Sequence, residues 1–327
     1  MKLVLGVDGG GTKTACVLAD TNGKILAATV TGPSNFLSMS GGVEEVTSLL
    51  KQAVAEVLNK AGAAEQDVET AFFAMAGVGL SGKSRAMEEI ISGLPALKKC
   101  AYDIDAVAAL AGATTKEWGI VTISGTGAIS IGVSREGRRA RAGGWGYLIG
   151  DEGSGYDIGR RGLQAAARAY DGRGTATLLQ RRAEEYFRLD SLDKFRAFLY
   201  RNCGEKETVA SFAPQVTAAA EKGDWTAQKI LDDAGKELAL TSAAVIRKLG
   251  LTGTPTTVAA CGGVLCHSKY VFSSLREELK RKTPLAKVVK PQYPAVTGAV
   301  ILGFNKLQIP VTQEILCNLE KTGRRLI

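Results

Sequence analysis

The chain has 327 residues, of which 45% are hydrophobic and 23% charged; these ordinary globular values exclude disordered, collagen-like and coiled-coil chains. The length predicts two domains, and a formal net charge of +8 is moderate for that length. A single histidine, His267, excludes most serine–histidine–aspartate hydrolases and multi-histidine metal enzymes. A catalytic base is therefore expected to be a carboxylate.

The six cysteines show no Cys-X-X-Cys spacing, and no apolar run reaches the roughly 18–20 residues that span a membrane. Together with the lack of a signal peptide, this predicts a cytoplasmic protein with no membrane partner. No long basic block with interleaved aromatic residues occurs, so no nucleic-acid partner is expected either.

The first part of the chain predicts an α/β unit that opens with three strands. An apolar strand at 3–7 runs into the glycine-rich segment 8–14, and a second strand follows at 15–19. Asn22-Gly23 is a hairpin signal that leads to a third strand at 24–30. The remaining predicted elements are a helix at 41–61, a strand at 70–76, a helix at 81–91, a strand at 100–104 and a helix at 105–113.

From Gly119 the opening pattern returns: a strand, a turn rich in glycine and threonine, a strand, a polar-glycine hairpin at Glu136-Gly137, and a third strand. This recurrence predicts an internal duplication at the scale of a domain. The predicted elements of this part are strands at 120–123, 129–133 and 138–142, helices at 151–170, 175–187, 192–202, 207–221 and 226–249, a strand at 256–260, a helix opened by Gly262-Gly263, a strand at 286–289, and helices at 295–307 and from 313.

Two glycine-rich turns are predicted to bind phosphate. In the segment from Asp8 to Thr14, glycines let backbone N–H groups approach a phosphate, and Thr12 and Thr14 add hydroxyl donors. Asp8, at the strand end, can hold Mg²⁺ through water. Ser124-Gly-Thr-Gly127 occupies the same place in the second copy, and each turn has the alternative reading of a purely structural turn.

A third glycine-rich segment, from Gly77 to Ser84, fits the Walker A pattern and the dinucleotide fingerprint. It lies in the middle of the first domain instead of after the opening strand, and the duplication already supplies two phosphate turns. We therefore expect this match to be coincidental and the loop to border a substrate cleft.

Three motifs resemble those of the actin/Hsp70/sugar-kinase superfamily: Asp8-Gly-Gly-Gly-Thr-Lys-Thr14, Ser124-Gly-Thr-Gly127 and Ala260-Cys-Gly-Gly-Val264. The run Ala142-Gly-Gly-Trp-Gly-Tyr-Leu-Ile-Gly-Asp-Glu-Gly-Ser154 is more specific. It is similar to N-acetylglucosamine and murein amino-sugar kinases of the BadF/BadG/BcrA/BcrD ATPase family. The resemblance extends over essentially the whole chain.

The resemblance implies an α/β fold with two ribonuclease-H-like, actin-type ATPase domains, an interdomain cleft and a second domain enlarged by helices. We place these domains at 1–115 and 116–312, with a C-terminal helix at about 313–327 that packs back on the first. The implied activity is ATP-dependent phosphorylation of the 6-hydroxyl of N-acetylglucosamine or N-acetylmuramic acid. ATP and Mg²⁺ are the implied cofactors, and a homodimer is expected.

The resemblance also assigns residues by motif position. Asp105 is the implied base that takes the proton of the sugar hydroxyl. The implied ATP and phosphate ligands are Gly10, Gly11, Thr12, Lys13, Thr14, Gly125, Thr126, Gly127, Gly262 and Gly263. The implied sugar contacts are Asn35, Gly77, Asp105, Gly144, Trp145 and Asp151, and the implied metal residue is Asp8.

Plainer roles stay open for several of these residues. Asp105 and Asp151 could be ordinary helix N-caps, Asn35 a turn residue and Trp145 a core residue. The chain also departs from its relatives at Ala128-Ile129, where many carry polar residues, so a polar contact is missing there or supplied elsewhere.

Two other functions remain as alternatives. One is an ATPase that activates a reductase or dehydratase and carries an iron–sulfur cluster; the other is a glucosamine or glucose kinase. The sequence does not separate these sugars from the N-acetylated ones.

Overall fold

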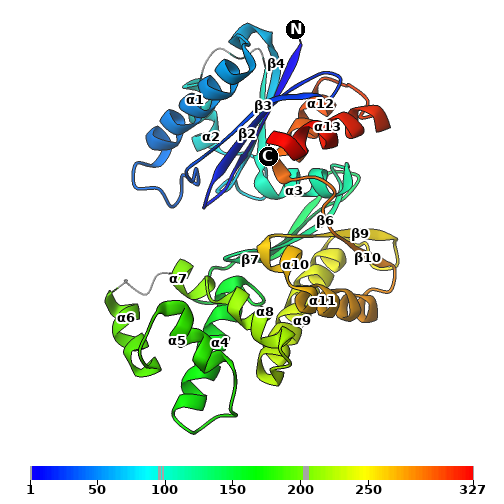
Figure 1. The fold of residues 1–327 in the computed structure, drawn as a ribbon. Helices are drawn as coiled ribbons and strands as arrows, with labels where there is room; N and C mark the ends of the chain where they lie inside the picture. The colour runs from blue at the N-terminus through cyan, green and yellow to red at the C-terminus, as the bar shows by residue number, and fades with distance from the viewer. Residues whose placement is uncertain (1, 95–96, 98, 202–205, 327) are drawn as a thin grey trace. The chain divides into compact units, whose positions relative to one another are not determined.

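The computed structural model describes residues 2–94, 97, 99–201 and 206–326. The chain divides into two compact units, residues 1–119 together with 291–327, and residues 120–290 (Figure 1). Cys203 lies outside the described residues, and the other five cysteines are free thiols. Within the described ranges, no helix has the length and apolar character needed to cross a membrane.

The first unit is built on a five-stranded sheet in the order β3-β2-β1-β4-β5. The three strands β1 to β3 are antiparallel, and β1, β4 and β5 run parallel to one another. The strands are β1 (Leu3–Gly9), β2 (Thr14–Asp20), β3 (Ile25–Thr31), β4 (Val68–Met75) and β5 (Cys100–Ile104).

Helices cover both faces of this sheet, as Figure 1 shows, with α1 and α2 on one side and α12 and α13 on the other. Apolar side chains of β1, β4 and α1 form the core beneath α1 and α2. The helices of the first unit are α1 (Gly42–Ala61), α2 (Arg85–Ser92), α3 (Asp105–Thr114), α12 (Ala295–Lys306) and α13 (Gln313–Leu326), with a 3-10 turn at Glu65–Asp67.

Residues 291–312, predicted to belong to the second domain, are instead part of the first unit, because α12 packs against α3 and β1. Gly298 makes this packing close: a Cβ placed there would lie 2.0 Å from the carbonyl oxygen of Ala108. Only a residue without a side chain allows the backbones of α12 and α3 to approach to this extent. The last helix, α13, packs against β3 of the same unit.

The second unit contains a sheet in the order β10-β9-β6-β7-β8. Its strands are β6 (Gly119–Ser124), β7 (Ala128–Val133), β8 (Arg139–Gly143), β9 (Thr256–Cys261) and β10 (Ala286–Val289). Its helices are α4 (Gly155–Tyr170), α5 (Leu179–Phe187), α6 (Phe195–Arg201), α7 (Lys206–Ala210), α8 (Ala213–Glu221), α9 (Trp225–Lys248), α10 (Gly263–His267) and α11 (Lys269–Lys282), with a 3-10 turn at Leu192–Lys194.

The two sheets have the same topology. Read from the other edge, the second sheet is β8-β7-β6-β9-β10, which matches β3-β2-β1-β4-β5 strand for strand. This equivalence confirms the predicted duplication, and helices α4 to α9 make up the predicted helical enlargement of the second copy. The glycine-rich turns β1–β2 and β6–β7 are therefore equivalent, as are the loops that follow β4 and β9.

Candidate functional site

The turn between β1 and β2 leaves its backbone open to solvent. The N–H of Gly10 donates a hydrogen bond to the carbonyl oxygen of Lys13 at 3.0 Å, which closes the turn. Gly11, Thr12 and Lys13 are exposed, and a Cβ at Gly11 would meet no other atom. Free backbone N–H groups and the Lys13 ammonium suit a phosphate ligand.

Thr14 differs from the other residues predicted to contact phosphate, because it is fully buried. Its hydroxyl lies 2.8 Å from the carbonyl oxygen of Gly32 and 2.7 Å from Ser34 Oγ. The N–H of Ser34 in turn donates to the carbonyl oxygen of Gly10. Thr14 therefore ties the glycine-rich turn to the segment after β3, and its hydroxyl is directed away from solvent.

Asp8 and Asp105 lie at the same edge of the first sheet. Because β1, β4 and β5 are parallel and in register, Asp8 is aligned with Ala74 and Ala74 with Asp103. Asp105 follows β5 as the first residue of α3, and its Oδ1 accepts a hydrogen bond from the N–H of Ala106 at 2.8 Å. The helix N-cap is Ile104, so the side chain of Asp105 is not needed as a conventional cap.

Both carboxyl groups have a perturbed acidity. Burial, with a contribution from the nearby carboxylate of Asp105, raises the pKa of Asp8 to about 7, and Lys13 opposes this rise. Burial also raises the pKa of Asp105, against the hydrogen bond from Ala106. A raised pKa makes a carboxylate a stronger proton acceptor, which suits it to act as a general base.

The chemistry of this pair is also suited to a divalent cation. Two buried carboxyl groups that lie near each other repel when both are ionised, and a bound cation relieves that repulsion. No cluster of three or more potential metal-ligating side chains occurs among the described residues, so water would supply the remaining ligands. The residues present therefore fit the water-mediated Mg²⁺ site expected at Asp8.

Asn35 and Gly77 are neighbours in the first unit. A Cβ at Gly77, which has a φ of +92°, would lie 2.8 Å from Asn35 Oδ1. That oxygen accepts the N–H of Leu37 at 3.1 Å, so Asn35 does act as a turn residue. Its amide nitrogen makes no hydrogen bond with any described residue and remains free to donate to a ligand.

The loop with the Walker-like spacing is organised around its following helix. Ser84 is the N-cap of α2, and its Oγ accepts the N–H of Met87 at 3.3 Å. The hydroxyl of Tyr102 lies 3.2 Å from the N–H of Ser84. In a working P-loop the corresponding hydroxyl is directed to a metal ion, so this cap supports a coincidental match.

In the second unit, the turn between β6 and β7 is fixed by hydrogen bonds to the segment before α4. Ser124 Oγ donates to the carbonyl oxygen of Gly153 at 2.8 Å, and the N–H of Gly155 donates to that of Gly125 at 2.7 Å. Gly262, with a φ of +89°, lies against the same turn, since a Cβ there would be 2.3 Å from the carbonyl oxygen of Ser124. The fold thus brings the predicted phosphate and adenosine motifs of this unit together.

Asp151 lies beside this turn and is only 4% exposed. A Cβ at Gly127 would be 2.8 Å from Asp151 Oδ2, and the same oxygen forms an ion pair with Lys206 Nζ at 3.4 Å. Asp151 has a φ of +60° and lies ahead of α4, whose N-cap is Ser154. The N-cap alternative for Asp151 is therefore wrong.

Lys206 was not predicted as a site residue. It is separated from Asp151 by 55 positions in sequence, and its Nζ also lies 5.6 Å from the ring centre of Tyr147. A lone lysine at the start of a short helix carries no signal in a single sequence. Only the packing of α7 beside α4 brings it to the carboxylate.

Trp145 is not a core residue, because 64% of its surface is exposed. The guanidinium of Arg141 lies 4.7 Å from the ring centre. Next to it, a Cβ at Gly144 would be 2.6 Å from Cδ1 of Ile129, so the side chain of Ile129 fills the space beneath this backbone. At Ile129, where a polar contact was expected to be missing, this chain therefore has an apolar support for the tryptophan segment.

Comparison with known proteins finds one matching family and relatives that are named as amino-sugar kinases. The model of the BadF/BadG/BcrA/BcrD ATPase family matches residues 5–303. The chain is 35% identical over 302 residues to an N-acetylmuramic acid/N-acetylglucosamine kinase of Clostridium acetobutylicum, covering 92% of this chain and 98% of the relative. It is 30% identical over 315 residues to an N-acetyl-D-glucosamine kinase of Dictyostelium discoideum, covering 93% and 98% of the two chains.

Among solved structures, a candidate N-acetylglucosamine kinase from Chromobacterium violaceum has a TM-score of 0.74 and 26% identity to this chain. The match covers 93% of this chain and 99% of that one. The likeness therefore extends over both units.

Proposed function

Because the chain belongs to the BadF/BadG/BcrA/BcrD ATPase family, we propose that it is an ATP-dependent kinase of N-acetylated amino sugars that phosphorylates the sugar 6-hydroxyl. Two relatives that are 35% and 30% identical to this chain are named as kinases of such sugars. Those names favour the kinase over the ATPase activator of a reductase or dehydratase.

The observation that carries the proposed mechanism is the position and acidity of Asp105. Its carboxyl group is held at the start of α3 by the N–H of Ala106, and burial raises its pKa. In the proposed reaction the sugar oxygen attacks the γ-phosphorus, its proton passes to Asp105, and ADP leaves. Phosphoryl transfer depends mainly on positioning and charge stabilisation, so one well-placed carboxylate suffices as the base.

The two glycine-rich turns supply the proposed phosphate contacts. The proposed donors are the N–H groups of the exposed Gly11 to Lys13 in the first unit and of the half-buried Thr126 and Gly127 in the second, whereas the N–H of Gly125 donates to the carbonyl oxygen of Gly127 at 2.9 Å and holds the turn. Gly262 and Gly263 are the proposed contacts to the adenosine. Mg²⁺, when bound beside Asp8, neutralises charge on the phosphates.

The proposed sugar contacts include Asn35 in the first unit and Asp151 and Trp145 in the second, and each is described within its own unit. Asn35 has a free amide nitrogen, and Asp151 is a buried carboxylate paired with Lys206. Trp145 presents an exposed ring of the kind that packs against the apolar face of a sugar. Although Lys206 is paired with Asp151, its ammonium has three donors, and we propose that it also contacts the carboxylate of an acidic sugar such as N-acetylmuramic acid.

The proposal is tested by measuring ADP release from ATP with N-acetylglucosamine, N-acetylmuramic acid, glucosamine and glucose as separate substrates. We expect ADP release with at least one N-acetylated sugar, and phosphorus–proton correlation spectra should place the product phosphate on carbon 6. Absence of ADP release above the sugar-free rate with all four sugars would overturn the proposal.

The role of Asp105 is tested by Asp105→Asn, with Asp193→Asn as the matched control on an exposed aspartate of the second unit. The amide keeps the oxygen that accepts the N–H of Ala106 but cannot take a proton, so kcat should fall by a factor on the order of 10²–10⁴. Calorimetric sugar affinity should change only a few-fold. A near-normal kcat would exclude Asp105 as the base and make Asp151 the next residue to test.

A further inference from the structure

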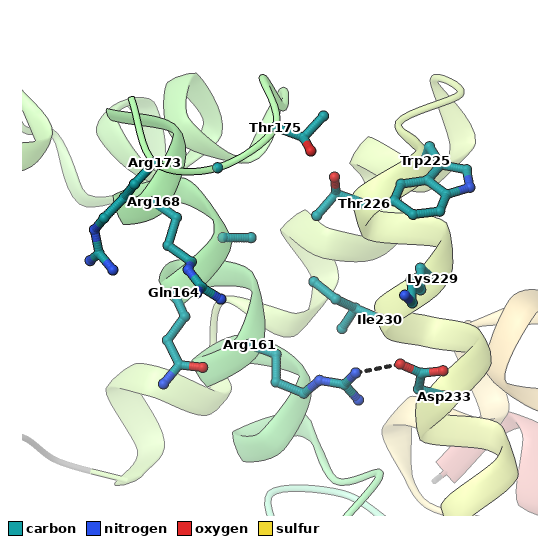
Figure 2. A pocket seen from close by; sticks show the side chains of 12 residues that line it. Arg161, Gln164, Arg168, Arg173, Thr175, Trp225, Thr226, Lys229, Ile230 and Asp233 are labelled. Carbon is teal, nitrogen blue, oxygen red and sulfur yellow. Dashed lines mark hydrogen bonds and ion pairs between the residues drawn. The ribbon is translucent and has the colours of Figure 1, made fainter. Parts of the chain in front are cut away.

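The second unit has a cavity of about 370 Å³ that none of the residues assigned to ATP or sugar lines. Figure 2 shows it between α4, which carries Arg161, Gln164 and Arg168, and the first turns of α9, which carry Trp225 and Lys229. The loop after α4 closes a third side with Arg173 and Thr175.

Basic residues outnumber acidic ones in the lining of this cavity. Arg161, Arg168, Arg173 and Lys229 all contribute to it, and Asp233 is the one carboxylate among the lining residues, all of which lie in the described ranges. Asp233 is already paired with Arg161 at 2.6 Å. Positive charges that lie close together without a carboxylate partner repel one another. This repulsion raises the free energy of the empty cavity and favours an anionic ligand.

Two of these basic residues, Arg168 and Lys229, have no carboxylate partner among the described residues, so their charge is available to a ligand. The side chain of Arg168 forms no hydrogen bond or ion pair with any described residue, and Figure 2 shows it beside Gln164 on the cavity side of α4. Lys229 has no carboxylate partner in the same part of the structure, and its Nζ lies 5.4 Å from the ring centre of Trp225. Arg173, by contrast, is paired with Asp171 at 2.7 Å. A planar guanidinium with free donors is suited to bidentate phosphate binding.

The cavity also has a part without charge. Trp225 is 65% exposed, which is unusual for a tryptophan, and its ring faces the ammonium of Lys229. Ile230 lines the cavity below it, and the hydroxyls of Thr175 and Thr226 add neutral donors. A ligand that fills the whole cavity would thus combine an anionic group with a ring or another apolar group.

We propose that this cavity binds a small phosphate ester, with its phosphate on Arg168 and Lys229 and its organic part against Trp225. A guanidinium binds carboxylate and phosphate in the same bidentate way, but phosphate suits two separate cations better than a single carboxylate does, because it offers three oxygens and up to two negative charges. The volume of about 370 Å³ accommodates a small ester and its bound water.

The test is isothermal titration calorimetry of the full chain at low ionic strength, with inorganic phosphate and with phenyl phosphate as separate probes. We expect both to bind and phenyl phosphate to bind more tightly. Arg168→Gln should weaken both about tenfold, because it removes a charge-assisted hydrogen bond. Trp225→Ala should weaken only phenyl phosphate.

The matched control is Arg181→Gln, which removes an exposed arginine of α5 outside the cavity and should leave both affinities unchanged. Lys229→Gln serves as a second cavity variant if Arg168→Gln lowers the melting temperature. Two results would overturn the proposal: the wild-type chain shows no saturable heat with either probe, or the cavity variants and Arg181→Gln weaken binding equally, as expected for unspecific charge.

Discussion

The stability of the chain should rise when the charge of Asp8 is removed, although this residue is proposed to serve catalysis. Burial and the nearby Asp105 carboxylate raise the pKa of Asp8 from its ordinary value of 3.8 to about 7. The folded state therefore favours protonated Asp8, whereas the unfolded chain ionises it near pH 4. Asp8→Asn replaces the carboxyl group by a neutral group of nearly the same shape.

The sign follows from linkage between proton binding and folding. The stabilisation from protonated Asp8 is fully present below pH 3.8 and is lost as the pH rises through about 7. At about 1.4 kcal/mol per pH unit, the shift from 3.8 to about 7 corresponds to an upper limit of about 4 kcal/mol. Asp8→Asn should therefore match the wild type near pH 4 and exceed its stability increasingly up to pH 8.

The measurement is differential scanning calorimetry of both proteins between pH 4 and pH 8, with a chelator and without nucleotide. At pH 8 the melting temperature of the first unit should be higher in Asp8→Asn by several degrees, up to about 10 °C. Asp193→Asn, on an exposed residue, is the control and should show no pH-dependent gain. A variant that melts at or below the wild-type temperature at pH 8 would refute the reasoning.

Three further predictions concern the site. Lys83→Ala should leave the KM for ATP unchanged in the ADP-release assay, because the Walker-like loop is built around the Ser84 cap; a large rise in this KM would restore the P-loop interpretation. Thr14→Val should lower the free energy of unfolding by about 1–2 kcal/mol in a denaturant titration, since it leaves Ser34 Oγ without its buried partner; an unchanged midpoint would count against a bracing role. Lys206→Met should raise the KM for N-acetylmuramic acid more than for N-acetylglucosamine, and an equal rise for both sugars would exclude a contact with the lactyl carboxylate.

The duplicated sheet could be predicted because its signals are local. Asn22-Gly23 and Glu136-Gly137 specify the two hairpins, and the glycine-rich turns before them fix where β1 and β6 end. Helix boundaries in the second unit were harder to predict. The expected single helix at 207–221 is divided into α7 and α8, because Pro214 lacks the N–H that a continuous helix needs.

Site residues could be predicted where a single residue and its neighbours in sequence decide its position. They could not be predicted where the packing of distant segments decides it. Asp105 directly follows a strand, so its place at the sheet edge could be inferred from the sequence. Thr14 was expected to face a phosphate, yet the chain after β3 folds back and encloses its hydroxyl with Gly32 and Ser34. The pairing of Asp151 with Lys206 likewise depends on helices that no local pattern places together.

The duplication explains why the proposed base and metal residue both lie in the first unit. The two sheets offer equivalent edges, but the residues on them differ in charge. After β5 the first unit has Asp105, whereas after the equivalent β10 the second unit has Lys290, whose Nζ lies 5.2 Å from the ring centre of Phe272. Near the end of β1 the first unit has Asp8, and β6 ends at the neutral Ser124. A general base needs one carboxylate placed at this edge and a cation site needs acidic oxygen ligands, so in our proposal both functions lie in the first copy, and the second copy contributes its backbone turns and Asp151.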